Sequence, residues 1–273
     1  MAPTADQLAD AFKRHFQSAD REIEWLRAEV EHSMWLAPGV LLVGRIDAIG
    51  RNAEGHLFFG EWKTASKFGA KNWKLTYRLN PQTLTYGVLI NDYVTRDPAT
   101  FDGRGCERFT VRKAFKADPP TCDFAWFRYA QQELDFWRRE LLTVAHEIRQ
   151  APVVGNWPTN FNHCFRYGPD YACPFFDPAC SKQQWEAKPA DALVRISHLD
   201  IERRLNEHDV APPGTIVLDA TRVNLWFECR ERFRREYIDQ IAVPPGEALK
   251  MGIDFHQILG DYYQGMIKEK EGK

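Results

Sequence analysis

Gly44-Arg45-Ile46-Asp47, Gly60-Glu61-Trp62-Lys63-Thr64 and Gln82-Thr83-Leu84-Thr85-Tyr86 are the three stretches that decide the fold. A hydrophobic run at 40–43 leads into Asp47 as one strand, turn-forming residues follow at 52–55, and residues 57–63 return as a second strand. Side chains two apart on a strand share a face, so Glu61 and Lys63 point the same way and Trp62 points into the opposite layer. The pattern therefore predicts a β-hairpin in which Asp47 lies beside Glu61.

Two carboxylates and one lysine on a sheet face are a combination suited to phosphodiester cleavage. Oxygen ligands from Asp and Glu suit Mg²⁺ or Mn²⁺, which keep several waters and bind phosphate oxygens of a substrate. The metal makes a bound water a better nucleophile, and a nearby ammonium group stabilises the developing charge or orients the water. We therefore expect Asp47 and Glu61 to bind a metal ion and Lys63 to assist the attack of water.

The ordered set Gly-x-x-Asp, Glu-x-Lys and Gln-x-x-x-Tyr resembles the PD-(D/E)XK nuclease superfamily, and within it the branch of RecB-type and CRISPR-associated iron-sulfur exonucleases. The resemblance implies an α/β fold with a restriction-endonuclease-like core, a mixed central sheet flanked by helices and a Cys-clamped lobe. It implies that Asp47, Glu61 and Lys63 are catalytic, and that Gln82 and Tyr86 lie near the DNA end. The Trp62 carbonyl is a further candidate metal ligand. Glu-x-Lys alone is common on solvated strands, so the ordered set carries the inference.

Charge and composition narrow the way in which nucleic acid is bound. The chain of 273 residues has a formal net charge of -2, so contact with DNA requires a local basic patch rather than an overall positive charge. Such a patch is predicted after Lys63, where cations and aromatic residues occur without an intervening acid. Its candidate substrate-binding residues are Lys67, Lys71 and Lys74, with Trp73 and Tyr77 among them. The alternative is an ordinary solvated loop.

The chain shows no apolar run of the about 18 residues that are needed to span a bilayer. We therefore expect an intracellular, cytoplasmic protein of a bacterium, an archaeon or a virus-infected host. Six cysteines in a reducing compartment are metal ligands or buried thiols more often than disulfides.

Periodicity and capping signals predict the other elements. Thr4 can cap a helix over 5–17, and Asn80 followed by Pro81 can open a helix that ends near 93. Residues 25–36 and 108–115 have strand patterns, whereas 124–150 is expected to be one long amphipathic helix and 191–209 helix and linker. The family resembled here often carries another acid in its first strand, and Glu29 and Glu31 are both candidates.

A long loop over 152–180 contains Cys164, Cys173 and Cys180. A folded loop of this length needs something to hold it, and three thiolates on one metal centre would do so. The resemblance implies a [4Fe-4S] cluster with Cys229 as the distant fourth ligand, and Zn²⁺ is the alternative. In that branch the three late cysteines are usually closer together in sequence than Cys164, Cys173 and Cys180 are.

Residues 221–237 around Cys229 resemble the helix that normally opens such nuclease domains, and the segment around His256 resembles the next helix, whose histidine is a metal ligand. Both usually precede the strand that carries the aspartate, and here both follow it. We therefore predict a circular permutation, with the end of the 250–266 helix approaching residue 5. A truncated second copy of the domain and a segment swapped between protomers are the alternatives.

These interpretations predict a nuclease core over 1–150, a Cys-rich cluster segment over 151–190, a linker or helix over 191–214, and a permuted segment over 215–273 that packs on the core. The expected function is Mg²⁺- or Mn²⁺-dependent DNA cleavage, exonucleolytic on single-stranded or frayed ends, in DNA repair, recombination or phage biology. A helicase or a recombination or adaptation factor is the expected kind of protein partner. The alternatives are a catalytically silent DNA- or partner-binding module with the same fold, and a zinc-stabilised structural protein.

Overall fold

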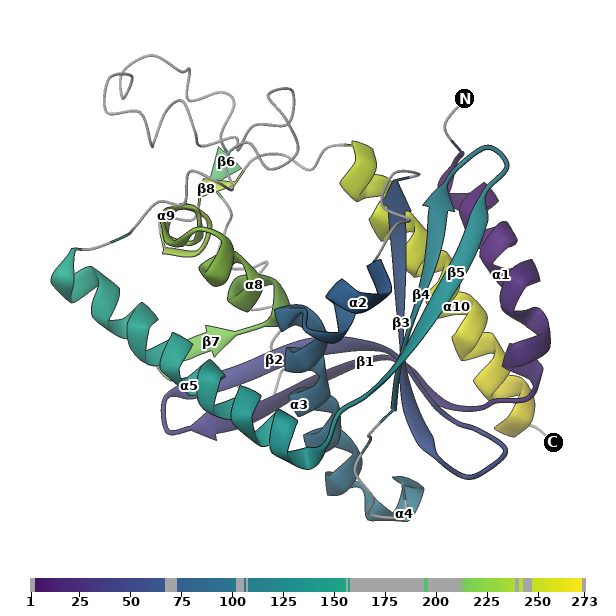
Figure 1. Cartoon of the computed structure of the whole chain (residues 1–273), viewed down its shortest axis with the longest axis horizontal. Coiled ribbons are helices and arrows are strands. Elements are labelled where there is room, and N and C mark those ends of the chain that lie inside the picture. Colours follow the sequence, from purple (N-terminus) through teal and green to yellow (C-terminus); the bar gives the residue numbers. More distant parts are fainter. Residues whose placement is uncertain are drawn as a thin grey trace. The chain divides into compact units, whose positions relative to one another are not determined.

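The computed structural model in Figure 1 describes residues 3–66, 73–101, 106, 108–155, 157, 194–195, 212, 214–238, 241–242 and 247–271. Its internal contacts divide the chain into two units. The first consists of Met1–Met34, Val43–Arg138 and Gly246–Lys273, and the second of Trp35–Leu42 and Arg139–Pro245. The carboxyl-terminal helix thus groups with the amino-terminal elements, although nearly the whole chain separates them in sequence.

A mixed sheet organises the first unit. Its strands are β1 (Glu24–Ala37), β2 (Val40–Arg51), β3 (Leu57–Ser66), β4 (Arg108–Lys116) and β5 (Thr121–Arg128), and they are hydrogen-bonded in that order. The β2–β3 and β4–β5 pairs are antiparallel, whereas β3 and β4 run parallel. This arrangement confirms the predicted α/β class with a mixed central sheet flanked by helices, and it is consistent with a restriction-endonuclease-like core.

Helix α1 (Ala5–Arg21) begins where the sequence predicts. The Thr4 side chain accepts a hydrogen bond from the Gln7 backbone N–H, and the Gln7 side chain accepts one from the Thr4 backbone N–H, which completes a capping box. Leu8, Phe12 and Phe16, spaced four apart, form the buried face of the helix. The helix extends one turn beyond the predicted end.

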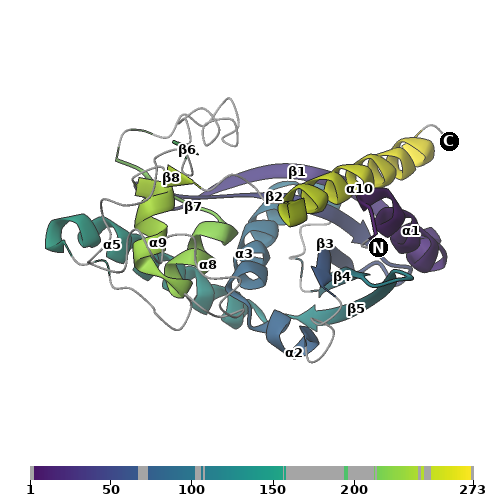
Figure 2. The ribbon, with the colours of Figure 1, turned by 90° about the horizontal axis from the view of Figure 1, so that it is seen from above.

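Helix α10 (Glu247–Glu271) lies beside α1 in both Figure 1 and Figure 2. Its buried residues Phe255, Leu259 and Tyr263 also recur every four positions and join the core that Phe12 and Trp62 fill from the other side. The Tyr263 ring stacks on Trp62 at 4.7 Å between centroids. The side of β3 that carries Trp62 is therefore covered by two helices from opposite ends of the chain.

The direction of α10 corrects one expectation. The Lys270 ammonium donates a hydrogen bond to the Ile23 carbonyl at 2.9 Å, and the Tyr263 hydroxyl donates to Asp20. Helix α10 therefore runs parallel to α1 and ends beside the first residues of β1, not beside residue 5 as predicted. The pairing of apolar stripes allows either direction, and these polar contacts at the far end select the parallel one.

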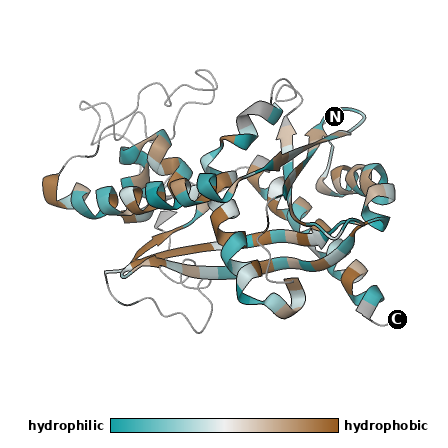
Figure 3. Ribbon diagram, turned by 60° about the horizontal axis from the view of Figure 1, so that its bottom comes forward, coloured by the Kyte–Doolittle hydropathy of each residue, from teal (hydrophilic) through white to brown (hydrophobic). Residues whose placement is uncertain are grey.

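The predicted long helix over 124–150 is wrong in its first third. Residues 121–128 form β5, and helix α5 (Gln131–Val154) begins only after it. Ala125 and Phe127 are buried against β4, whereas Phe124 and Trp126 are about half exposed, which is the two-residue period of a strand. Figure 3 shows brown hydrophobic residues alternating with teal hydrophilic ones along the elements of the fold. Aromatic residues fit a strand as well as a helix, so an apolar count alone misses the boundary.

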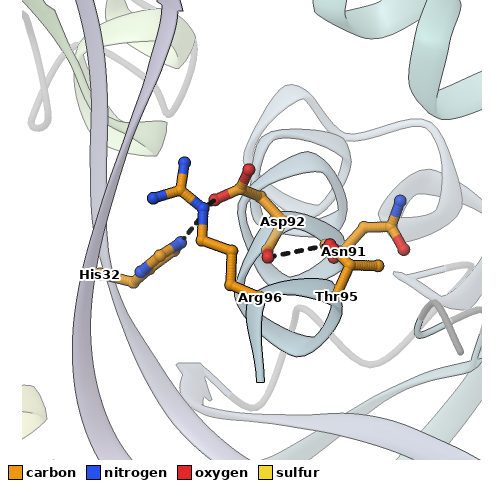
Figure 4. A network of polar contacts seen from close by, with 5 residues as sticks. All are labelled: His32, Asn91, Asp92, Thr95 and Arg96. Carbon is orange, nitrogen blue, oxygen red and sulfur yellow. Dashed lines mark hydrogen bonds and ion pairs between the residues drawn. The ribbon is translucent and has the colours of Figure 1, made fainter. Parts of the chain in front are cut away.

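Helix α3 (Pro81–Arg96) begins as predicted, because Asn80 caps it and Pro81 occupies its first turn. A polar network holds it against β1 (Figure 4). The His32 ring nitrogen Nε2 lies 2.9 Å from Asp92 Oδ2, and Arg96 lies 2.7 Å from the same oxygen. Burial would raise the pKa of Asp92, but the hydrogen bond with His32 and the charge of Arg96 hold that pKa below its ordinary value. This network fixes the helix that carries Gln82 and Tyr86.

Two short helices complete the first unit, α2 (Trp73–Arg78) and α4 (Pro98–Phe101). In the second unit, β7 (Ile216–Leu218) pairs in parallel with the first residues of β2, and β6 (Val194–Arg195) pairs with β8 (Ile241–Ala242). Helices α8 (Ala220–Glu228) and α9 (Arg230–Phe233) follow, and then a π-helical turn, η5 (Arg234–Ile238). The Trp226 indole donates to Glu147 of α5.

Several predictions fall on residues that the structure does not describe. They are the cluster ligands Cys164, Cys173 and Cys180, the basic residues Lys67 and Lys71, and most of the helix and linker expected over 191–209, of which only β6 is described. The Cys-clamped lobe and the predicted domain boundaries therefore stay predictions. Within the part of the chain that the structure describes, no helix combines the length and the apolar character that a bilayer crossing requires.

Candidate active site

The β2–β3 hairpin brings Asp47 and Glu61 together. Its register pairs Ala48 with Gly60, so the next opposing positions are Asp47 and Glu61. The Trp62 backbone N–H donates to Asp47 Oδ2 at 2.8 Å, which fixes the carboxylate against the neighbouring strand. A turn chosen by local sequence thus positions two acids that lie 14 residues apart.

Glu61 and Lys63 form an ion pair on one face of β3. Lys63 Nζ lies 2.8 Å from Glu61 Oε1, and the Glu61 side chain is only 1% exposed. Glu61 Oε2 is buried and accepts no hydrogen bond from any residue that the structure describes. Burial would lower the pKa of Lys63, but the nearby charge of Glu61, followed by Tyr86 and Asp47, raises it above its ordinary value. Lys63 is therefore a permanent cation beside an incompletely paired carboxylate.

Of the two acids considered in β1, Glu29 faces this site, whereas Glu31 is exposed. Glu29 has a φ of 55°, which is unusual for a residue other than glycine, and its side chain forms an ion pair with Arg45. Burial, and then the charge of Asp47, raises the pKa of Glu29 to about 7, although Arg45 opposes the rise. A Cβ atom at Gly260 would lie 2.8 Å from Glu29 Cγ, so α10 can approach this acid only through a glycine.

His256 projects from α10 toward the same acids. Its Nδ1 atom lies 3.7 Å from Asp47 Oδ2, and its side chain is 30% exposed. Burial lowers the pKa of His256 to about 4, and Lys63 acts in the same direction. The imidazole is therefore neutral at pH 7, which is the form that binds metal ions. The structure brings His256 beside Asp47 within one chain.

Tyr86 and Gln82, the two residues of α3 that are predicted to contact substrate, lie in different surroundings. The Tyr86 ring packs near Phe59, 5.8 Å between centroids, and its hydroxyl contributes to the raised pKa of Lys63. A Cβ atom at Gly44 would lie 2.7 Å from Leu89 and 3.3 Å from Tyr86, so the glycine of Gly-x-x-Asp allows α3 to approach β2. Gln82 is half-buried in the first turn of α3.

Lys74 forms its ion pair away from Asp47 and Glu61. Its ammonium forms an ion pair with Asp123 of β5 at 2.8 Å, and half of its side chain is exposed. The Trp73 indole donates to the same carboxylate. The shared carboxylate of Asp123 therefore ties α2 to the edge of the sheet.

The donor set fits a hard divalent cation. Among the described residues, no three His, Cys, Asp or Glu side chains stand in a ready metal-binding arrangement. Yet Glu61 Oε2 and Glu29 Oε1 are buried without hydrogen-bond partners in the described part of the chain. Burial also raises the pKa of Asp47 to about 6, with Lys63 opposing the rise. Buried carboxylate oxygens that have no donor among the described residues, in the neighbourhood of a neutral imidazole, suit Mg²⁺ or Mn²⁺.

The raised pKa of Asp47 predicts that the metal-free protein loses stability as pH rises, because the buried carboxylate then ionises. Its ordinary value is 3.8, so between pH 4 and pH 6 the folded protein binds this proton more tightly than the unfolded chain, and the free energy of unfolding falls as pH rises through that window. We expect Asp47→Asn, which cannot ionise, to be about 1–3 kcal/mol more stable than wild type at pH 8 in EDTA, and equally stable near pH 4. Urea denaturation measures the difference.

The exposed Asp254→Asn on α10 is the matched control, for which we expect no such pH-dependent gain. Equal stability of Asp47→Asn and wild type at both pH values would contradict the argument that ionised Asp47 destabilises the metal-free fold.

A family model described as the PD-(D/E)XK nuclease superfamily matches residues 2–177. No curated protein sequence matches the chain. Among solved structures, one titled "Crystal structure of SSO0001" is 14% identical, with a TM-score of 0.27 over 51% of this chain and 58% of that chain. The alignment thus spans little more than half the length of that chain.

Proposed function

We propose that this chain, which belongs to the PD-(D/E)XK nuclease superfamily, is a metal-dependent deoxyribonuclease that hydrolyses phosphodiester bonds. The observation that carries the proposal is the convergence of Asp47, Glu61 and Lys63 on one face of the β2–β3 hairpin. Buried carboxylate oxygens without donors are costly in a fold, and a cation-binding role accounts for them.

In this proposal Asp47, Glu61 and His256, with the Trp62 carbonyl, would hold Mg²⁺ or Mn²⁺. The bound ion would supply an activated water and neutralise charge on the phosphate. Lys63 keeps its proton, and its fixed positive charge would stabilise the charge that develops on the phosphate. His256 stays neutral, and the Trp62 N–H holds Asp47 in one orientation throughout.

We further propose that the substrate is a single-stranded or frayed DNA end and that cleavage is exonucleolytic. Gln82 and Tyr86 would position the terminal nucleotides, and the basic segment with Lys67, Lys71 and Lys74 would follow the phosphate backbone. The support is the position of Tyr86 beside Lys63, together with the pattern of basic and aromatic residues in that segment.

Cleavage of end-labelled single-stranded DNA in Mn²⁺ tests this function. We expect wild type to release nucleotides from the ends, to leave circular single strands intact, and to stop in EDTA. Lys63→Met keeps the length of the side chain but removes its charge, and we expect a loss of about 100-fold or more. Equal rates for wild type and Lys63→Met would show that the cleavage comes from a contaminant. Cutting of circular DNA would replace the exonuclease proposal by an endonuclease.

A structural [4Fe-4S] cluster on Cys164, Cys173, Cys180 and Cys229 is proposed from the sequence resemblance. Cys229 is buried in an extended conformation between α8 and α9, where the helix predicted over this segment is interrupted. We expect anaerobically purified protein to contain iron and sulfide, and Cys229→Ser to lose them, with Cys122→Ser as the control. Colourless protein with stoichiometric zinc would favour the zinc alternative instead.

We also propose that the chain is a circular permutation of the customary order. The support is that α10 groups with α1 and β3 in the first unit, although it ends beside Ile23 and not beside residue 5. His256 lies near Asp47 within one chain, which favours this arrangement over a segment swapped between protomers. A variant with new ends between 214 and 215, in which a flexible linker long enough to span α1 joins 271 to residue 3, is expected to fold.

A further inference from the structure

We propose that Lys113 is a second phosphate-binding ammonium of this site, which holds a phosphate of the DNA backbone next to the one attacked. This inference rests on the proposed nuclease function and names a residue that the motifs of the chain do not include. It concerns β4, the strand that lies parallel to the strand carrying Glu61 and Lys63.

The register places Lys113 on the catalytic face. Lys63 is paired with Lys113, and Trp62 with Arg112. Opposing residues on neighbouring strands point to the same side, so Lys113 shares the face of Glu61 and Lys63, about 4.8 Å along the sheet from Lys63. Arg112 points to the other face, where its guanidinium bonds to Asp20 and Tyr263. The two adjacent cations of β4 therefore serve different sides of the sheet.

Helix α2 holds the Lys113 ammonium between two aromatic rings. Nζ lies 4.1 Å from the centroid of Tyr77 and 4.6 Å from that of Trp73. These rings are fixed in turn, because the Trp73 indole donates to Asp123 and the two rings pack edge to face. An aromatic cage favours a cation and leaves it no freedom to turn away.

Within the described part of the chain, Lys113 lacks the carboxylate partner that its neighbours have. Its side chain is only 6% exposed, yet among the residues that the structure describes no carboxylate lies within ion-pair distance of its ammonium. Lys63 has Glu61, Lys74 has Asp123, and Arg112 has Asp20. A buried cation without a counter-ion is costly, and the chain retains one here beside a site built for phosphodiesters.

The electrostatic surroundings agree with this geometry. Burial lowers the pKa of Lys113 to about 8, with Glu61 opposing the shift and Lys63 adding to it. An arriving phosphate would supply the missing negative charge and keep this amine protonated at neutral pH. The two lysines are paired on adjacent strands, so both ammonium groups lie on the face where a nucleic-acid strand would bind.

Salt-dependent binding distinguishes a phosphate contact from a purely structural role. The test is the affinity for a short fluorescent single-stranded oligodeoxynucleotide over a range of salt concentrations. Ca²⁺ replaces Mg²⁺, and the oligonucleotide is checked to be intact. Removal of one phosphate contact lowers the slope of log K against log salt by about 0.7. We expect Lys113→Met to show this change and a Kd raised about 10-fold or more at low salt. Lys113→Arg, which keeps the charge, is expected to retain the wild-type slope.

Lys13→Met is the matched control. Lys13 lies on α1, and its ammonium also lies over an aromatic ring, that of Tyr262. This variant is expected to leave the slope unchanged. Equal slopes for wild type and Lys113→Met, with both variants folded by circular dichroism, would overturn the role of Lys113. Cleavage by wild type, measured in parallel, decides the nuclease proposal separately.

Discussion

Glu61→Gln is expected to abolish cleavage, with a fall in rate of about 1,000-fold or more. The side chain is almost fully buried, so a nearly isosteric amide keeps the packing of β3 and changes only the charge. The amide offers one oxygen where the carboxylate offers two, and its NH₂ group would face Lys63, which lies 2.8 Å from Oε1. In the proposed mechanism, the loss of a metal ligand and the repulsion of Lys63 act together on the same transition state.

Two measurements separate this effect from misfolding. Calorimetric titration with Mn²⁺ is expected to show strong binding by wild type and at least about 10-fold weaker binding by Glu61→Gln. Thermal unfolding in EDTA is expected to show that the variant still folds with one cooperative transition, although Lys63 has lost its carboxylate partner. Glu54→Gln, in the exposed turn of the same hairpin, is the control and should leave both cleavage and Mn²⁺ binding intact. Wild-type cleavage by Glu61→Gln would remove this carboxylate from the site and, with it, the proposed mechanism.

The parts of the fold that the sequence predicts correctly depend on local interactions. The hairpin follows from its turn residues and alternation, α1 from its capping box, and α3 from Asn80 and Pro81. Each signal lies within a few residues of the element that it defines. The proximity of Asp47 and Glu61 is predictable for the same reason, since one turn decides it.

The remaining features depend on partners distant in sequence. Choosing Glu29 over Glu31 requires the conformation of β1 at a positive φ and the approach of α10 through Gly260. The role proposed for Lys113 depends on the parallel pairing of β4 with β3 and on the packing of α2 over it. The boundary between β5 and α5 likewise depends on pairing with β4. Residue types indicate chemistry here, whereas tertiary contacts decide which residue of each type takes part.

Asp20→Ala is expected to cost about 3–5 kcal/mol of stability, the largest effect of any substitution remote from the carboxylates. Asp20 is fully buried and binds the buried Arg112 guanidinium, and the Tyr263 hydroxyl donates to Asp20 at 2.9 Å. Burial raises the pKa of Asp20, and Arg112 only partly offsets it. Without the carboxylate, Arg112 remains charged among Phe16, Trp25 and Trp62 with no counter-ion in the described core.

The same cluster joins α1, β4 and α10, and α10 carries His256. Asp20→Ala should therefore weaken Mn²⁺ binding as well as folding, whereas Tyr263→Phe, which removes one hydroxyl and keeps the stack on Trp62, is expected to cost only about 1 kcal/mol. Asp10→Ala, on the exposed side of α1, is the control and should change stability by less than about 0.5 kcal/mol. Urea denaturation ranks the three. A cost for Asp20→Ala no larger than that for Asp10→Ala would mean that Arg112 does not depend on this carboxylate, and that the aromatic rings and Tyr263 alone hold α10 over the site.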